Sequence, residues 1–382
     1  MTLSAGFVLL AGAAVPSFIL AWCFTVIIRQ LAPRWGLVDR PNARKVHQTP
    51  IPLGGGLAIG LAVLTTFACG ELALWCALRY PAVAALVPDF VRPHLPGLAS
   101  RSTDLWVLLG SASILMVLGL CDDRFGLDWR LRLSVQFAVA TACVITQGWR
   151  LTAFISVPQL GWVVSVGMSV VWIAAMVNSF NMLDNMDGLS AGVAVIAAAI
   201  LALVLMLAPD PTTQRPQLFV AGFLLVLAGA LCGFLWHNWP PATIFMGDAG
   251  SYFVGFCIAV ATLLATYAGY HSATRHAILA PLCVMAVPLY DMTTVIWIRL
   301  REGRSPFEAD KNHFSHRLVD LGFSKKHAVW TIYLTTFTCG LGAMLLHRVD
   351  TLGAALIVLW ILCILLLIAI LESTARRNRK RE

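Results

Sequence analysis

The sequence predicts an all-α integral membrane protein with about eleven transmembrane helices. Its 382 residues are 59% hydrophobic and only 12% charged, whereas soluble domains have roughly 45–50% and roughly 25%. The apolar residues form long runs, since Leu3–Ile28 contains no charged side chain and Leu53–Leu78 contains only Glu71. About 20 helical residues cross the hydrocarbon of a bilayer. These runs lack the alternation of barrel strands, so helices are predicted.

Successive apolar runs give the expected helices in chain order. The first is interpreted as a retained helix with an external N-terminus, because no Lys or Arg precedes it and it exceeds the apolar core of a signal peptide. One transmembrane domain is expected over residues 1–375, followed by a basic cytoplasmic tail at 376–382. The runs are residues 3–28, 53–78, 104–120, 131–147, 159–177, 188–208, 217–235, 251–268, 276–297, 328–346 and 352–371.

The distribution of Lys and Arg predicts which side of the membrane each connection faces. With an external N-terminus, 20 of the 27 basic residues fall in inner segments and 7 in outer ones. Cytoplasmic loops carry such an excess, so the C-terminus is expected in the cytoplasm and the number of helices is expected to be odd. The net charge of +8 then reflects topology and attraction to anionic lipid, and no nucleic-acid partner is predicted.

The polar motifs all fall on the segments assigned to the inner side, although composition alone does not require this. In chain order they are Arg44-Lys45-x-His47 with Pro50-x-Pro52-x-Gly54-Gly55-Gly56, then Asp122-Asp123, Asn178-x-x-Asn181-x-x-Asp184-x-x-Asp187-Gly188, Phe245-Met-Gly247-Asp248-x-Gly250-Ser251, and Asp310-x-x-His313-x-x-His316-Arg317.

Acidic residues at inner helix ends are the first candidates for chemistry. Asp184 and Asp187 are three residues apart and would share one face of a helix. Together with Asn181 they form an oxygen-rich cluster where carboxylates are costly and usually functional. Asp122 and Asp123 taken alone are equally compatible with a solvated helix end. Oxygen donors without cysteine are typical of Mg²⁺ or Mn²⁺ rather than zinc.

The Gly247–Ser251 segment opens a helix and suits an anion. Backbone N–H groups at a glycine-flanked turn can hold a phosphate, and the carboxylate of Asp248 can hold a hard cation. An N-cap formed by Asp248 or Ser251 is the structural alternative.

Two basic clusters are candidates for phosphate contacts. His313 and His316 lie one turn apart beside Arg317, in the most basic inner loop, and this favours an anion over a two-histidine metal site. Lys45 and His47 belong to a second cluster, for which simple membrane anchoring is the alternative.

Together these motifs resemble the polyprenyl-phosphate N-acetylhexosamine-1-phosphate transferase family, most closely the undecaprenyl-phosphate GlcNAc-1-phosphate transferase branch. The resemblance spans roughly residues 35–325 in order. It implies transfer of a sugar 1-phosphate from a UDP-amino sugar to undecaprenyl phosphate, with release of UMP. GlcNAc-1-phosphate is the expected group, and another UDP-N-acetylhexosamine is the alternative donor. It also implies Mg²⁺ or Mn²⁺ and a bacterial inner membrane with a cytoplasmic active site, and a homodimer is compatible with it.

Two positions depart from the family pattern. Ser315 stands where this branch usually has a middle histidine, and this bears on the identity of the sugar. Asn185 replaces the glycine that is common after Asp184, and this change is expected to be neutral.

The roles expected from the resemblance cover all five motifs. Asp122 or Asp123 is expected to orient or deprotonate the lipid phosphate.

A secondary transporter is the rival function, but it predicts charged residues in the middle of the helices and inverted repeats. An inactive lipid-binding scaffold is a third possibility, but it would not need the acidic residues. Asp291, one to two turns from the inner end of its helix, is a candidate to cap or brace the site, and Glu71 receives no role. The expected catalytic residues are Asp122, Asp123, Asp184 and Asp187; the metal ligands are Asp248 with Asp184 or Asp187; the substrate-binding residues are Lys45, His47, Asn181, Gly247, Ser251, His313, His316 and Arg317.

Overall fold

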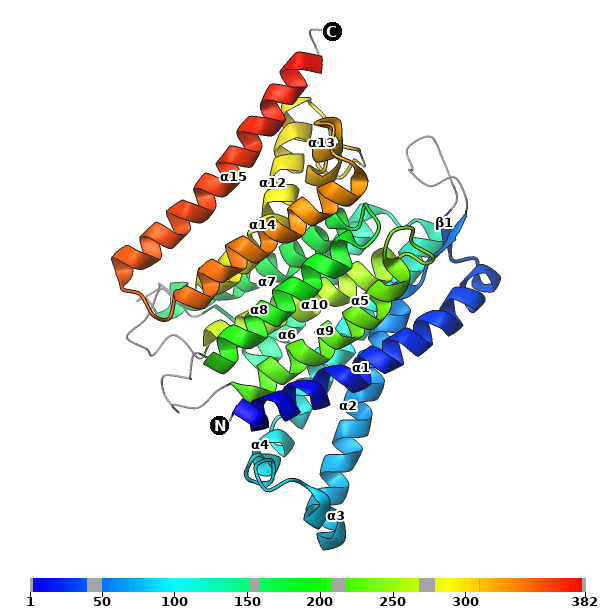
Figure 1. Cartoon of the computed structure of the whole chain (residues 1–382), viewed down its shortest axis with the longest axis vertical. Helices are drawn as coiled ribbons and strands as arrows, with labels where there is room; N and C mark the ends of the chain where they lie inside the picture. Colours follow the sequence, from blue (N-terminus) through cyan, green and yellow to red (C-terminus); the bar gives the residue numbers. More distant parts are fainter. Residues whose placement is uncertain are drawn as a thin grey trace.

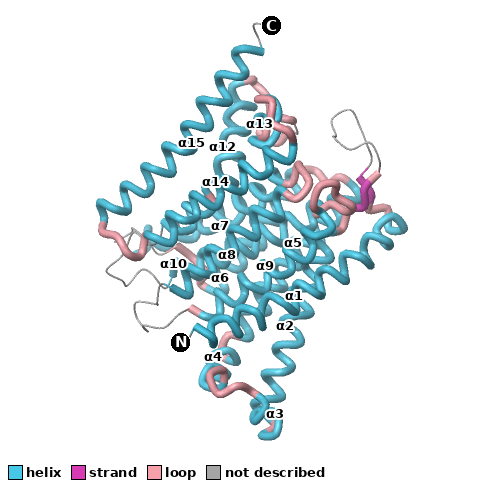
Figure 2. Tube along the Cα trace, in the orientation of Figure 1, coloured by secondary structure: helices cyan, strands magenta, loops and turns pink. Residues whose placement is uncertain are grey.

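A computed structural model describes residues 3–39, 50–151, 158–207, 217–267, 279–308 and 310–379 of the chain. These residues are helical almost throughout, as Figures 1 and 2 show. The one sheet in the described part is a two-stranded antiparallel pair, β1 (Val38–Asp39) and β2 (Ile51–Pro52). The predicted all-α class is confirmed.

Each of the eleven predicted runs contains helix. The long helices are α1 (Leu3–Leu31), α2 (Gly55–Arg79), α5 (Ser102–Phe125), α6 (Trp129–Gln147), α7 (Pro158–Leu183), α8 (Leu189–Leu207), α9 (Leu218–Asn238), α10 (Gly247–Tyr267), α12 (Ala286–Arg301), α14 (Lys325–Leu345) and α15 (Thr351–Arg379). The short ones are η1 (Ala32–Trp35), α3 (Pro81–Leu86), η2 (Arg92–His94), α4 (Leu95–Ala99), α11 (Ala280–Val284) and α13 (Phe314–Asp320). Because α15 continues to Arg379, most of the predicted basic tail extends the last helix.

Nine helices of the described residues are long and apolar enough to cross a membrane, which supports a multi-pass membrane protein. The two further runs of the prediction differ for physical reasons. Helix α6 carries Arg130, Arg132 and Gln136 in its first two turns, and these lower its mean hydropathy. The run at 276–297 is divided at Met285 into the short α11 and the 16-residue α12. The count of eleven and the external N-terminus remain predictions.

Helix α10 is the central helix of the bundle and packs against α2, α5 and α7. In its apolar stretch 83% of the residues are buried, whereas the value for the peripheral α15 is 17%. Glycines allow the close approach of its neighbours. A Cβ on Gly56 would lie 2.0 Å from the Gly250 nitrogen, and a Cβ on Gly119 would lie 2.4 Å from the Ala249 nitrogen. The first turn of α10 is therefore held against two other helices.

The described residues of the polar motifs lie at one end of the bundle. In Figure 1 the N-terminus lies at the opposite end from β1 and α13. The backbone N–H of Gly55 donates to the Phe245 carbonyl at 2.9 Å, and that of Gly56 donates to the Met246 carbonyl at 2.9 Å. The glycines of the first motif thus join the segment that leads into α10.

Candidate functional site

Asp123, at the end of α5, caps the first turn of α10. Its carboxylate accepts the backbone N–H of Asp248 at 2.9 Å and that of Ala249 at 3.2 Å. Free N–H groups at a helix start favour such an acceptor. Gly247 has φ 72°, and a Cβ there would lie 2.5 Å from Asp123 Oδ2. Only glycine fits this turn, which explains its place beside Asp248.

Five further predicted site residues meet at the same turn. Asp184 Oδ2 accepts the backbone N–H of Gly247 at 3.2 Å. The Asn181 amide donates to Asp248 Oδ1 at 2.6 Å and to Ser251 Oγ at 3.1 Å. The end of α7 and the start of α10 are therefore bound together through side chains that bear oxygen. With Asp123, the residues Asn181, Asp184, Asp248 and Ser251 form what we call the acidic centre.

The acidic centre concentrates negative charge. Asp184 lies just beyond α7, where burial and then the charge of Asp123 raise the pKa of its carboxyl to about 7, although the bond from Gly247 opposes this. Desolvated carboxylates that lie close together favour protonation or a bound cation. A cation would relieve the repulsion directly.

Asp122 points away from its neighbour and is bound to other partners. Its carboxylate accepts the Leu127 N–H at 2.8 Å, Arg132 Nη1 at 2.6 Å and the Tyr252 hydroxyl at 3.1 Å, and its side chain is 4% exposed. Adjacent helical residues face different directions, so the two aspartates have different partners, although both contact α10. Asp122 fastens α6 and α10 to the end of α5.

Arg132 is a site residue that sequence reasoning missed. Its Nη1 lies 2.6 Å from Asp122 Oδ2 and 3.9 Å from Asp248 Oδ2. By sequence alone Arg132 is one of the basic residues of the predicted inner segments. The short turn between α5 and α6 was an available signal, because it brings the start of α6 back beside the end of α5.

Asp187 supports the neighbouring connection. Its Oδ2 accepts the backbone N–H of Ala242 at 3.0 Å, and the Gly188 N–H donates to Asn238 Oδ1 at 2.9 Å. The helical face expected for Asp184 and Asp187 is absent, because α7 ends at Leu183 and α8 starts at Leu189. Residues 184–188, which we call the acidic loop, contain Gly188 with φ 73°, a conformation that interrupts a helix.

Asp291, which the sequence offers as a residue that braces the site, contacts His313. Asp291 is fully buried, and its Oδ2 lies 3.0 Å from His313 Nδ1 while its Oδ1 accepts the Phe314 N–H at 2.5 Å. A carboxylate only accepts hydrogen bonds, so Nδ1 is the donor. Nε2 is then the ring nitrogen of His313 that Asp291 does not engage.

His316 lies on the first turn of α13 and is partly buried. Its ring centroid lies 6.3 Å from that of His313. Burial, followed by the charges of His313 and Lys311, lowers the pKa of His316 below its ordinary 6.5. The lowered pKa favours the neutral imidazole, which can still donate one hydrogen bond to a phosphate oxygen.

Two anchors fold the histidine loop, which we define as residues 310–317. Asp310 pairs with Arg299 at 3.1 Å and with Arg304 at 2.9 Å, and the bonds from Arg299 hold the pKa of this carboxyl well below its usual range. Arg317 is 5% exposed and pairs with Glu372 of α15 at 3.0 Å. The structure thus directs the Arg317 guanidinium into the protein.

Lys45 and His47 fall outside the described residues. Glu71 accepts the Ser102 hydroxyl at 2.6 Å, which links α2 to the start of α5.

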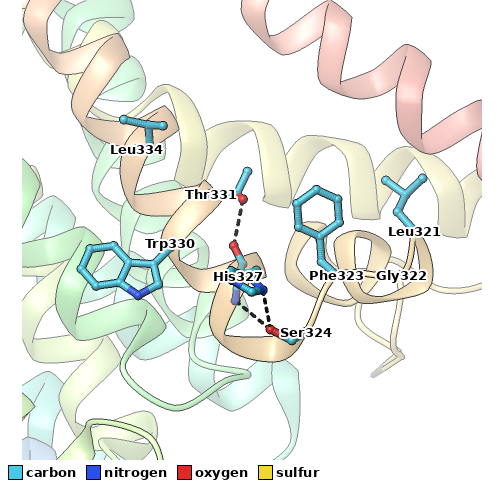
Figure 3. Close-up of a pocket in the computed structure, with 8 residues that line it drawn as sticks. All are labelled: Leu321, Gly322, Phe323, Ser324, His327, Trp330, Thr331 and Leu334. Atoms are coloured by element: carbon cyan, nitrogen blue, oxygen red, sulfur yellow. Dashed lines mark hydrogen bonds between the residues drawn. The ribbon is translucent and has the colours of Figure 1, made fainter.

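A surface hollow of about 490 Å³ lies where α13 meets α14. Figure 3 shows Trp330 and Phe323 in its lining, and Ser324 bonded to His327. No residue of the acidic centre lines it. The hollow is separate from the candidate site.

Comparisons with known proteins agree with the motifs. The sequence profile described as glycosyl transferase family 4 matches residues 105–266. The chain is 32% identical over 375 residues to a Bacillus subtilis (strain 168) protein named "Probable undecaprenyl-phosphate N-acetylglucosaminyl 1-phosphate transferase", covering 96% of this chain and 93% of that one. It is 34% identical over 350 residues to the decaprenyl-phosphate N-acetylglucosaminephosphotransferase of Mycobacterium tuberculosis (strain ATCC 25618 / H37Rv), with coverage of 87% and 81%. It is 28% identical over 326 residues to the undecaprenyl-phosphate alpha-N-acetylglucosaminyl 1-phosphate transferase of Escherichia coli (strain K12), with coverage of 83% and 78%.

Proposed function

Because the chain belongs to glycosyl transferase family 4, the polyprenyl-phosphate N-acetylhexosamine-1-phosphate transferases, we propose that it transfers GlcNAc-1-phosphate from UDP-GlcNAc to undecaprenyl phosphate and releases UMP. The names of its relatives specify the transferred group and a polyprenyl phosphate acceptor. The UDP-linked donor is our inference from the chemistry of a sugar 1-phosphate, which needs a nucleotide leaving group.

The acidic centre is the observation that carries this proposal. Asp123, Asp184 and Asp248 come from three segments and meet at the N-terminal turn of α10. They lie at helix ends, where a soluble donor and the phosphate of a membrane lipid can both arrive. A secondary transporter would need its charges near the middle of the helices. This arrangement favours an enzyme that works at the membrane surface.

We propose that the end bearing the acidic centre faces the cytoplasm of a bacterial inner membrane. The 20 of 27 basic residues assigned to inner segments support this orientation. Phe125, at the end of α5, is 69% exposed. In a variant with its other thiols blocked, Phe125→Cys should react with a membrane-impermeant maleimide in inverted vesicles and not in intact spheroplasts. The opposite pattern would reverse the orientation.

Mg²⁺ or Mn²⁺ is the cofactor that we propose, held by Asp248 with Asp184 or Asp187. No group of three His, Cys, Asp or Glu residues in the described part of the chain forms a ready ligand set. Mg²⁺ at phosphate sites is usually held by one or two carboxylates and the substrate phosphates, so the residues present fit such an ion. When bound, the ion neutralises the diphosphate and stabilises charge on the leaving phosphate.

The residues of the site then act by position and charge. An oxygen of the lipid phosphate attacks the β-phosphorus of the donor, and the bond from that phosphorus to the UMP oxygen breaks. A phosphate monoester is largely ionised near neutral pH, so Asp123 orients the acceptor and a strong base is not required. His313 and His316, with Lys45, bind the sugar diphosphate. Displacement in one step is expected; phosphate covalently attached to Asp122 or Asp123 during turnover would contradict it.

The assay uses the purified full chain in detergent with UDP-GlcNAc labelled in the sugar and undecaprenyl phosphate. Label should move into a butanol-soluble product only when both substrates are present. UDP-GalNAc and the UDP-MurNAc-pentapeptide are tested in parallel, and the donor that gives the most product identifies the sugar that the chain transfers. If no UDP-amino sugar gives product, the enzyme proposal is wrong.

Removal of divalent metal is expected to abolish the reaction. Without a cation, the negative donor diphosphate would approach three carboxylates, and their repulsion would oppose binding and transfer. Excess EDTA should stop product formation, and Mg²⁺ or Mn²⁺ should restore it while Na⁺ of equal ionic strength should not. Full activity in EDTA, with metal analysis showing no bound ion, would refute the proposal of a metal cofactor.

A further inference from the structure

Asn185 and Ser315 join the two loops that the proposed reaction uses. Asn185 follows Asp184 in the acidic loop, and Ser315 lies between His313 and His316. The Ser315 hydroxyl donates to Asn185 Oδ1 at 2.5 Å, and Ser315 is 1% exposed. This partly buried bond connects segments that are 130 residues apart in the chain.

Each partner is fixed on its own side of the bond. The Asn185 amide donates to the Met182 carbonyl at 2.8 Å, and its backbone N–H donates to the Leu183 carbonyl at 2.9 Å. On the other side, Phe314 is bonded through its N–H to the buried Asp291. The hydrogen bond is between two side chains, and the segments that carry them are each held in place by other hydrogen bonds.

We propose that the Asn185–Ser315 hydrogen bond sets the spacing between the acidic loop and the histidine loop, and thereby positions His313 and His316 against the sugar diphosphate. This role rests on the proposed function, and both residues are positioning residues. The donor would contact both loops, whereas the lipid phosphate would approach Asp123. Loss of the bond should therefore weaken binding of the donor and leave binding of the lipid unchanged.

The histidine loop has other anchors that keep it folded without this bond. Asp310 is held by Arg299, and Arg317 is held by Glu372. These ion pairs lie on both sides of Ser315 in the sequence. Loss of the Ser315 bond is thus expected to shift the loop and not to unfold it.

A double-mutant cycle tests the proposal, using Ser315→Ala, Asn185→Ala and the double variant of the full chain. Each single variant should raise the KM for UDP-GlcNAc about tenfold, because it breaks the bond that holds the two loops at their spacing and so misplaces the groups that bind the donor. The double variant should show no larger rise, because coupled partners are not additive. The KM for undecaprenyl phosphate and the thermal unfolding temperature should match those of the unaltered chain.

Ser17→Ala is the matched control. Ser17 is fully buried, and its hydroxyl donates across to the Val226 carbonyl at 2.8 Å, far from both loops. This variant should leave the donor KM unchanged. The Kd for UDP-GlcNAc should be measured by calorimetry on the unaltered chain and all the variants, without the lipid substrate. It should rise in each single variant, rise no further in the double variant and stay unchanged in Ser17→Ala.

The proposal is overturned if the two single effects add, or if the variants lose thermal stability while the donor KM and Kd stay unchanged. An unaltered chain that binds UDP-GlcNAc but forms no product would contradict the proposed function, while the Kd cycle would still decide the role of the pair. A chain that does not bind UDP-GlcNAc would contradict both.

Discussion

Asp248→Asn is expected to lower kcat by roughly a thousand-fold, the size of effect that follows removal of a key charge-stabilising group. Asp248 receives the Asn181 amide on Oδ1, and an asparagine oxygen can still accept that bond. Its backbone N–H would remain capped by Asp123. The substitution therefore removes the negative charge proposed to hold the metal and leaves the turn intact.

The measurement is single-turnover transfer at saturating donor and acceptor, with thermal unfolding in the same detergent as the test of folding. Asp89→Asn is the matched control, because the Asp89 side chain is 93% exposed and pairs only at the surface with Arg92. It should retain full activity. If Asp248→Asn turned over within threefold of the unaltered chain, Asp248 could not be a metal ligand.

Asp291→Asn should lower kcat/KM by roughly 10- to 100-fold, as expected for the loss of a residue that orients a functional histidine. Asp291 accepts from both His313 Nδ1 and the Phe314 N–H. An asparagine can keep the bond to the backbone, but its amide then faces Nδ1 with a donor. His313 would have to rotate or change tautomer.

Glu71→Gln provides the comparison, since Glu71 is also a carboxylate within an apolar run and has one bond, from Ser102. It should stay within about twofold, the scatter of substitutions away from a site. The two variants should be assayed with both substrates varied. Equal losses for Asp291→Asn and Glu71→Gln would mean that Asp291 acts only through general stability.

The sequence was sufficient for the fold class, the family and the grouping of the motifs. Long apolar runs predict helices because the bilayer offers no other partner for the backbone. The motif residues Asn181, Asp184, Asp248 and Ser251 do meet, because α7 and α10 pack side by side and carry them at the same end. The positions of the acidic residues relative to the apolar runs were enough to place each of them at the end of a helix.

Contacts between distant segments could not be predicted in the same way. In the sequence Arg132 does not differ from the other arginines of the predicted inner segments. In the structure the turn after α5 brings it beside Asp122. Asp291 is separated from the other motifs in the sequence, and only the folded structure shows that it contacts His313 of the histidine loop. Asn185 and Ser315, the two departures from the family pattern, lie in different motifs of the sequence, yet their side chains are hydrogen-bonded to each other. Each of these depends on tertiary packing, which a single sequence does not display.

The central claim is that sugar and phosphate move together to the lipid, and a donor labelled with ³²P at the β-phosphate tests it most directly. With undecaprenyl phosphate and the purified chain, the ³²P should enter the butanol phase together with the sugar, and one unlabelled UMP should be released for each lipid formed. If the ³²P stayed in the aqueous phase as UDP while the sugar moved to the lipid, the transfer of a sugar 1-phosphate would be contradicted.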